Sequence, residues 1–216
     1  MLIGSYLAGI SLSCERGPID SGHADGRGRT NMIFLGLGGN LPSRQFGEPR
    51  ATLQSALGAL DDQEVRVLRR SHWYRSRPVP DDGQPWYING VAELETALSP
   101  AELLARLLEL EHRFGRVRRE RWAPRMIDLD LLAYHELSNW DNPDAAPPIL
   151  PHPRLHERAF VLLPLAELAP GWRHPALQRA VEDLLRQLPP GQYVAADPTP
   201  SEPANRGEVA GAPPTR

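Results

Sequence analysis

A helix with strong end signals, lying directly between two strand patterns, is the feature that most constrains the fold of this chain. Ser99 can cap the helix and Glu102 can complete a capping box, while Gly115 can end it in a left-handed conformation. Residues 88–98 before the helix alternate between apolar and polar side chains, and an apolar run at 127–134 follows it. This arrangement predicts a helix that packs on a sheet formed by its neighbouring strands.

Four further elements complete the predicted order. We expect a buried strand at 32–37 that ends in a tight turn at 38–40, a helix at 49–60, a strand at 64–76 and a final helix at 175–188. The buried stripe of the central helix is expected to contain Leu103, Leu104, Leu107, Leu108 and Phe114. The order β-α-β-β-α-β favours an α+β sandwich, in which helices cover an antiparallel sheet.

The composition excludes several kinds of chemistry. All 24 basic residues are arginines, so a phosphate-loop lysine, a Schiff-base lysine and a lysine nucleophile are excluded. The net charge of −3 does not give the strongly basic surface of a nucleic-acid-binding protein. The single cysteine, Cys14, excludes an internal disulfide and is compatible with a reducing cytoplasm.

Both ends of the chain are expected to lie outside the domain. Residues 2–12 resemble the apolar part of a signal peptide only weakly, because they lack a basic segment before them and a clear cleavage site. We therefore interpret residues 1–31 as a disordered or mis-started extension, with Met32 as the natural start of the domain at 32–196. The proline-rich tail at 197–216 is predicted to be disordered.

An arginine-rich stretch leads directly into two aspartates. The arginines are Arg116, Arg118, Arg119, Arg121 and Arg125. If 127–134 is a strand, Asp128 and Asp130 point to one face, and the apolar residues between them point to the other. Paired carboxylates suit a hard cation such as Mg²⁺, and guanidinium groups suit phosphate oxygens. Together they indicate a metal–nucleotide substrate.

Other interpretations of these residues stay open at this point. The aspartates could belong to a solvated strand face, and the arginines to a surface stripe. An RNA-binding domain would also use arginines, but it predicts aromatic residues on the sheet in a recognisable pattern, and none is visible. A metal-dependent phosphohydrolase would use the same acid pair together with further acids or histidines, and nearby only His135 and Glu136 are available.

The segment from Arg121 to Leu132, Arg-Trp-Ala-Pro-Arg-Met-Ile-Asp-Leu-Asp-Leu-Leu, resembles the signature of the 6-hydroxymethyl-7,8-dihydropterin pyrophosphokinases of folate biosynthesis. Similar blocks occur in the family's order elsewhere. They are Phe34–Leu41, Tyr74–Pro78, Gln84–Asn89, Leu150–Phe160 and Pro164–Pro170. The resemblance covers about residues 32–188. It implies a ferredoxin-like core with added C-terminal elements, and transfer of pyrophosphate from ATP to the pterin hydroxymethyl group, with AMP as the other product.

The resemblance also assigns roles on the nucleotide side. Asp128 and Asp130 are expected to bind two Mg²⁺ ions, and Arg116 and Arg125 to act with them in catalysis. The residues expected to bind the nucleotide are Glu111, Arg118, Arg121, Trp122, His152 and Arg158. Three of these have a purely structural alternative: Glu111 could be a surface acid, Arg118 could belong to an exposed charged loop, and His152 could stabilise a turn between prolines.

On the pterin side, the resemblance implies an aromatic pair and a polar group that reads the ring. Tyr87 and Phe160 are expected to stack on the pterin, and Asn89 to hydrogen-bond to it, while Ser76 and Val79 offer backbone contacts. Tyr87 and Phe160 could instead be ordinary core aromatics. The expected partners are ATP and the hydroxymethyl-dihydropterin, bound by a cytoplasmic monomer that binds neither nucleic acid nor membrane.

Overall fold

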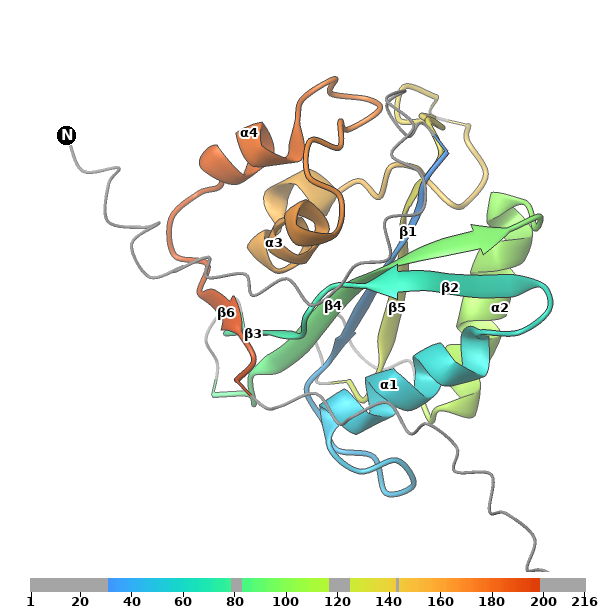
Figure 1. Cartoon of the computed structure of the whole chain (residues 1–216), viewed down its shortest axis with the longest axis vertical. Coiled ribbons are helices and arrows are strands. Elements are labelled where there is room, and N and C mark those ends of the chain that lie inside the picture. The colour runs from blue at the N-terminus through green and yellow to red at the C-terminus, as the bar shows by residue number, and fades with distance from the viewer. Residues whose placement is uncertain (1–30, 79–82, 117–124, 143, 199–216) are drawn as a thin grey trace, which may run out of the picture.

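An antiparallel sheet lies between two layers of helices in the computed structural model, which describes residues 31–78, 83–116, 125–142 and 144–198 (Figure 1). The strands are β1 (Ile33–Gly39), β2 (Val65–Arg70), β3 (Tyr74–Ser76), β4 (Tyr87–Thr96), β5 (Asp128–Tyr134) and β6 (Val194–Ala196). The helices are α1 (Pro49–Leu60), α2 (Pro100–Arg113), α3 (Ala159–Leu168) and α4 (Val181–Arg186), with a 3₁₀ turn, η1 (Leu155–Glu157). In the part of the chain that is described, no helix is long and apolar enough to cross a membrane.

β1 lies in the middle of the sheet and fixes where β5 sits. It pairs with β4 on one side and β5 on the other, so that Leu35 lies opposite both Ala92 and Leu131. β2 and β3 both pair with β4, and β6 pairs with β3. Every one of these pairings is antiparallel, which confirms the predicted α+β fold with helices covering an antiparallel sheet.

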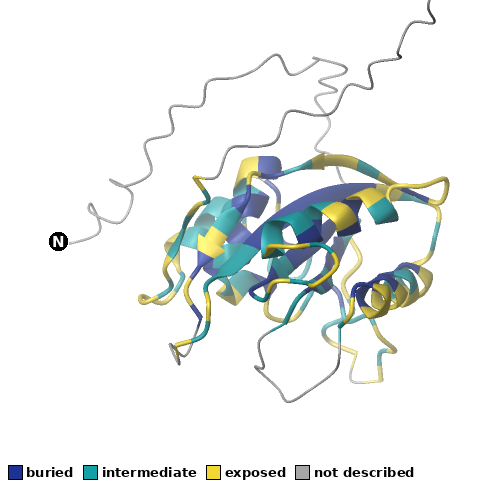
Figure 2. Ribbon diagram, turned by 90° about the horizontal axis from the view of Figure 1, so that it is seen from below, coloured by how far each residue is buried: buried dark blue, intermediate teal, exposed yellow. Residues whose placement is uncertain are grey.

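Each face of the sheet is covered by its own pair of helices. Side chains alternate between the faces along β1. Ile33 and Leu35 pack in the cluster that contains residues of α1 and α2, whereas Phe34 packs in the cluster that contains residues of α3 and α4. Figure 2 shows the strands largely buried between helices whose outer sides are exposed. Because both faces are covered, polar residues of β4 such as Asn89 and Glu93 are buried as well.

α2 begins and ends where its sequence predicts. The Ser99 hydroxyl accepts from the Glu102 N–H, and the Glu102 carboxylate accepts from the Ser99 N–H, which confirms the capping box. Gly115 follows the helix with φ of 83°, in the left-handed region. The buried stripe differs from the prediction at two positions. Leu104 is only half-buried. Leu108 is 37% exposed, and the inward positions at this end of the helix belong to Leu110 and Glu111.

Two of the expected boundaries near the sheet are wrong. β1 does not turn at residues 38–40 but continues through Gly39, which lies opposite Ile88. The single strand expected at 64–76 is divided into β2 and β3, because Trp73 turns into the core and is only 3% exposed. The Ser71 hydroxyl accepts the Val91 N–H at this interruption.

The helix expected at 175–188 is also wrong in extent, since α4 begins only at Val181. The His174 N–H donates to the Arg179 carbonyl, and Gln178 has a left-handed φ of 54°, so the residues between them form a tight loop. α3, which no periodicity indicated, supplies most of the covering layer on this face of the sheet.

His174 is a fully buried histidine in this C-terminal region. Its ring lies 4.9 Å from the Trp140 ring and 5.8 Å from the Trp172 ring, measured between centroids. Its Nδ1 accepts the Leu177 N–H, which requires the neutral imidazole. Burial, followed by the nearby His156, lowers the pKa of His174 to about 4.

We expect acid to destabilise the protein through His174. Its pKa rises to about 6.5 on unfolding, so the unfolded chain binds the additional proton as the pH falls from 6.5 towards 4. The free energy of unfolding should therefore fall by about 2–3 kcal/mol over this window from His174 alone. Urea unfolding at pH 7 and pH 4.5 measures this loss. His174→Gln should reduce the change in the free energy of unfolding with pH, whereas His112→Gln, at an exposed histidine, should not. The same pH dependence in the wild type and both variants would contradict this role of His174.

Candidate active site

Asp128 and Asp130 lie on one face of β5, as predicted. Leu129 and Leu131 alternate with them and are buried, while the aspartate side chains are 23% and 38% exposed. Their partners on β1 are glycines, because Asp130 lies opposite Gly36 and Asp128 opposite Gly38. The two carboxylates are therefore presented together at a solvent-accessible edge of the sheet, beside a strand that places no bulky side chain there.

Three of the predicted arginines surround this acid pair. Arg116 follows α2, and its Nη1 lies 2.8 Å from an Asp128 oxygen. Arg125 precedes β5, and its Nη1 lies 2.6 Å from the other Asp128 oxygen. Arg158 immediately precedes α3, and its Nη1 lies 3.6 Å from Asp130. Guanidinium groups from three separate parts of the chain thus converge on two carboxylates.

Glu111 is a buried acid rather than a surface one. It is 2% exposed, and its carboxylate accepts the Leu129 N–H at 2.7 Å and also pairs with Arg116. Burial raises the pKa of Glu111 to about 7, although the two donors oppose this shift. Glu111 therefore links the end of α2 to β5 and holds Arg116 next to Asp128.

Replacing Glu111 by alanine should lower the free energy of unfolding by about 2–3 kcal/mol. The Leu129 N–H would lose its buried acceptor, and Arg116 would lose one of the two carboxylates with which it pairs. Glu111→Gln should retain most of the stability, since its amide oxygen can still accept that N–H. Urea unfolding at neutral pH measures both, with Glu109→Ala on the exposed side of α2 as control. Equal losses in the alanine and glutamine variants would contradict this role.

The electrostatics of the acid pair favour a cation. Burial, and then the neighbouring charge of Asp130, raises the pKa of Asp128. A positive ion between the carboxylates would relieve this repulsion. Within the described ranges no three histidine, cysteine or acidic side chains gather as a ready-made metal site. Two carboxylates alone are typical of Mg²⁺ sites at which the substrate's phosphates and water supply the other ligands.

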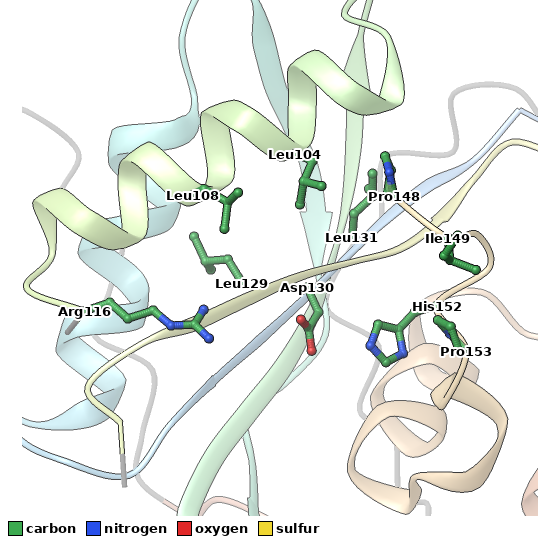
Figure 3. A pocket seen from close by; sticks show the side chains of 10 residues that line it. All are labelled: Leu104, Leu108, Arg116, Leu129, Asp130, Leu131, Pro148, Ile149, His152 and Pro153. Carbon is green, nitrogen blue, oxygen red and sulfur yellow. The ribbon is translucent and has the colours of Figure 1, made fainter. Parts of the chain in front are cut away.

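A pocket of about 380 Å³ opens beside these acids, as shown in Figure 3. One side is apolar, and the other carries charged or polar side chains. The apolar lining consists of Leu104, Leu108, Leu129, Leu131, Pro148, Ile149 and Pro153. The polar lining consists of Arg116, Asp130 and His152. The pocket therefore explains why Leu108 is exposed: it faces a hollow between α2 and the loop before η1.

His152 lies at the pocket and also stabilises a turn, while its predicted contact with the nucleotide stays a prediction. It lines the pocket, and its Nδ1 also accepts the Arg154 N–H in a turn. Burial, followed by the charge of Arg158, lowers the pKa of His152 to about 4. At neutral pH it is therefore an uncharged hydrogen-bonding group.

The residues expected on the pterin side come from β3, β4 and α3. Asn89 and Ser76 are buried, and the Asn89 side-chain amide donates to the Ser76 hydroxyl at 2.9 Å. Tyr87 lies opposite Ser76 in the β3–β4 register. Phe160 is half-buried on α3, and the Arg158 guanidinium lies 5.6 Å from its ring centroid. α3 packs against β4, so Tyr87 and Phe160 belong to neighbouring elements.

Four of the predicted site residues, Val79, Arg118, Arg121 and Trp122, lie outside the described residues. Conversely, Asn40 was not predicted to contact any of the site residues. Asn40 follows β1, is 1% exposed and hydrogen-bonds to Arg125 and Pro85. The only local signal was an amide after two glycines, which is more typical of a turn.

A comparison with protein-family models decides the family. The model for 7,8-dihydro-6-hydroxymethylpterin-pyrophosphokinase matches residues 34–170. The chain belongs to this family. The match contains β5 and every described residue of the predicted site, so the resemblance inferred from the sequence is confirmed, and the chain is a pyrophosphokinase.

Curated relatives support the same assignment. A 2-amino-4-hydroxy-6-hydroxymethyldihydropteridine pyrophosphokinase from Synechocystis is 42% identical over 155 residues, which cover 71% of this chain and 74% of the relative. The Pseudomonas aeruginosa protein of the same name is 41% identical over 158 residues, covering 73% of this chain and 91% of the relative.

Solved structures support the fold. A Plasmodium falciparum HPPK-DHPS triple mutant matches 76% of this chain with a TM-score of 0.54 at 14% identity. A second HPPK-DHPS structure, in complex with substrates, matches 72% with a TM-score of 0.56 at 11% identity. This pyrophosphokinase chain spans less than half of either, 45% and 42% respectively.

Proposed function

We propose that this enzyme catalyses Mg²⁺-dependent transfer of a pyrophosphoryl group from ATP to the hydroxymethyl group of 6-hydroxymethyl-7,8-dihydropterin. The observation that carries the proposal is the pair Asp128 and Asp130 on β5, surrounded by Arg116, Arg125 and Arg158. Acidic ligands for a metal and cationic ligands for phosphate within one site suit a metal–triphosphate substrate.

Asp128 and Asp130 would hold the magnesium ions, of which we expect two. They fit such ions because both are carboxylates, both reach solvent, and their mutual repulsion contributes to the raised pKa of Asp128. When bound, magnesium neutralises charge on the triphosphate and polarises the phosphorus that is attacked. The protein then has to align the substrates and to stabilise the charge that develops on the phosphates.

The arginines perform this second task. Arg116 and Arg125 now pair with Asp128, and each guanidinium has further N–H groups with which to bind phosphate oxygens in a fork. Arg158 is partly buried beside Asp130, where a desolvated charge acts strongly on phosphate. We propose that neutral His152 forms a hydrogen bond to the nucleotide. We also assign Arg118, Arg121 and Trp122 to nucleotide binding, on the basis of the family resemblance.

The pocket beside the acids is the proposed site for the nucleotide base and sugar. Its volume and its mainly apolar lining suit a flat heterocycle. Leu104 and Leu108 would cover one side of the base, and Ile149 would lie at the opposite loop (Figure 3). Because Arg116 and Asp130 form the polar edge of the same pocket, a nucleotide there would direct its phosphates towards the arginines.

The pterin would bind where β3 and β4 meet α3. Tyr87 and Phe160 provide aromatic surfaces, Asn89 and Ser76 provide buried polar groups, and Val79 is expected to contribute a backbone contact. In the reaction, the pterin hydroxymethyl oxygen forms a bond to the β-phosphorus of ATP. The bond from that phosphorus to the oxygen bridging the α- and β-phosphates breaks, AMP leaves, and the hydroxyl proton passes to solvent.

We further propose a ferredoxin-like core built from β1, α1, β2, β4, α2 and β5, since the sheet order β5-β1-β4-β2 is fully antiparallel and both helices pack on one face. The catalytic domain would be 32–196, working as a cytoplasmic monomer with extensions at 1–31 and 197–216. The first residue of the proposed tail, Asp197, still contacts the domain, because its N–H donates to the Trp73 carbonyl.

AMP release from ATP and Mg²⁺, with and without the hydroxymethyl-dihydropterin, tests the proposed function. We expect AMP and a pyrophosphorylated pterin in equal amounts, and only when both substrates and the metal are present. Release of free phosphate without the pterin would instead identify a phosphohydrolase. Salt-sensitive RNA binding that survives loss of Asp128 and Asp130 would favour the RNA-binding alternative.

A further inference from the structure

Asn40 connects two segments that are remote from it in sequence. Its Oδ1 accepts the Arg125 N–H at 2.9 Å, and its own N–H donates to the Arg125 carbonyl at 3.0 Å. Its Nδ2 donates to the Pro85 carbonyl at 3.1 Å and to the Gln84 side chain at 3.4 Å. An amide in this orientation satisfies both partners, because the Arg125 N–H needs an acceptor and the Pro85 carbonyl needs a donor.

Gly39 makes this contact possible. A Cβ atom at Gly39 would lie 2.5 Å from the Met126 carbonyl oxygen, closer than such atoms approach. The absence of a side chain lets the backbone at 125–126 lie directly against the end of β1. Asn40 is then 1% exposed, so its hydrogen bonds are shielded from water.

The two segments held by Asn40 lead to different parts of the proposed site. Arg125 contacts Asp128 through its side chain, on the phosphate side. Gln84 and Pro85 lie just before β4, whose first residues include Tyr87 and Asn89 on the pterin side. A single buried amide therefore fixes the start of the pterin-side strand relative to the arginine that contacts the catalytic acids.

We propose that Asn40 is a positioning residue that sets the distance between the pterin and the phosphates by holding the 84–85 segment against Arg125. This role rests on the proposed function. Pyrophosphoryl transfer requires the attacking oxygen to be aligned with phosphorus, and small displacements of either substrate reduce the rate strongly. Asn40 touches neither of the proposed substrate-binding surfaces itself and acts only through its two partners.

Asn139 offers a matched control. Its N–H donates to the Leu150 carbonyl at 2.9 Å, its Oδ1 accepts the Leu150 N–H at 2.7 Å, and its Nδ2 donates to the Pro148 carbonyl at 3.1 Å. The two side-chain bonds match those that Asn40 makes to Arg125 and Pro85, but they hold the 148–150 loop, which lines the proposed nucleotide pocket and not the proposed pterin side. Asn139→Ala therefore removes an equivalent set of hydrogen bonds without breaking the proposed link.

The test compares Asn40→Ala with Asn139→Ala in the full chain. In Asn40→Ala, we expect the Arg125 amide to exchange with deuterium about tenfold faster, because it loses a hydrogen bond of about 1.4 kcal/mol. We also expect kcat to fall about tenfold or more and the KM for the pterin to rise. In Asn139→Ala, the melting temperature should fall by a similar amount, but Arg125 exchange and the pterin KM should stay within twofold of the wild type.

Two milder variants keep the proposal testable if Asn40→Ala does not fold. Asn40→Asp retains the acceptor for Arg125 and loses the donor to Pro85, so Arg125 protection should persist while the pterin KM rises. Gln84→Ala removes only the longer contact and should raise the pterin KM slightly. Two results would overturn the proposal. One is that Arg125 exchange and the pterin KM are unchanged in Asn40→Ala, and the other is that both change as much in Asn139→Ala as in Asn40→Ala.

The outcome is separable from that of the proposed function. If the wild-type protein releases no pterin-dependent AMP, the proposed function fails. Amide exchange requires no turnover, so loss of Arg125 protection in Asn40→Ala would still support the link between the two segments, and retained protection would still overturn it.

Discussion

Replacement of Asp130 by alanine is expected to lower kcat for AMP release by on the order of 1,000-fold or more, because loss of a magnesium ligand removes several kcal/mol of transition-state stabilisation. The fold should be unaffected. The Asp130 side chain is 38% exposed, and its carboxylate lies 3.6 Å from the Arg158 guanidinium. The measurements are steady-state AMP release with ATP, Mg²⁺ and the pterin, together with the melting temperature.

Asp183→Ala provides the control for this substitution. Asp183 also forms an ion pair with an arginine, but on the exposed surface of α4. Its removal should leave kcat within about twofold of the wild type, as expected for a surface pair. Mg²⁺-dependent turnover within tenfold of the wild type in Asp130→Ala would refute the assignment of this carboxylate to the metal.

Replacement of Arg125 by alanine is expected to lower kcat/KM by roughly 30- to 1,000-fold, which corresponds to about 2–4 kcal/mol for a preorganised donor to the transition state. Arg125 lies next to Asp128, so under the proposed function its guanidinium is already placed where phosphate charge would develop. Arg125→Lys keeps the charge but loses the fork of N–H groups, and it should recover only part of the activity.

Arg66→Ala is the matched control, because Arg66 pairs with Glu95 at the protein surface and its side chain is 69% exposed. It should not change kcat/KM. The comparison of Arg125→Ala with the wild type requires that the backbone at residue 125 stays in place. Since Asn40 holds that backbone rather than the side chain, the alanine variant retains both backbone hydrogen bonds. A kcat close to that of the wild type would contradict the role of Arg125.

Local patterns predicted the part of the fold that carries the acids. The capping box at Ser99 and the alternation around Asp128 each depend on residues close in sequence, so they are readable without tertiary information. Arg116 and Arg125 were associated with these acids because they are close in sequence, whereas the place of Arg158 was expected only because of the family resemblance. Nothing local to Arg158 reveals that it lies beside Asp130.

The features that were missed depend on long-range contacts. α3 is apolar almost all round and contains Pro164, so it shows no amphipathic period. Asn40 resembles a turn residue because its partners lie 45 and 85 positions away. Glu111 could be taken for a surface acid, since the backbone N–H that it accepts belongs to β5. Each becomes visible only when the sheet has brought remote segments together.

The pairing of Asp128 with two guanidinium groups also has a consequence for how the enzyme is loaded. A bare divalent ion would have to displace a guanidinium from Asp128 in order to enter. Arg116 would keep its contact with Glu111, whereas Arg125 would lose the carboxylate that it contacts. A triphosphate that arrives with its own magnesium avoids this conflict, because its oxygens accept the released arginines. We therefore expect the free enzyme to bind magnesium weakly. When the nucleotide–metal complex binds, we expect the arginines to move from the carboxylate to the phosphates as the magnesium takes their place.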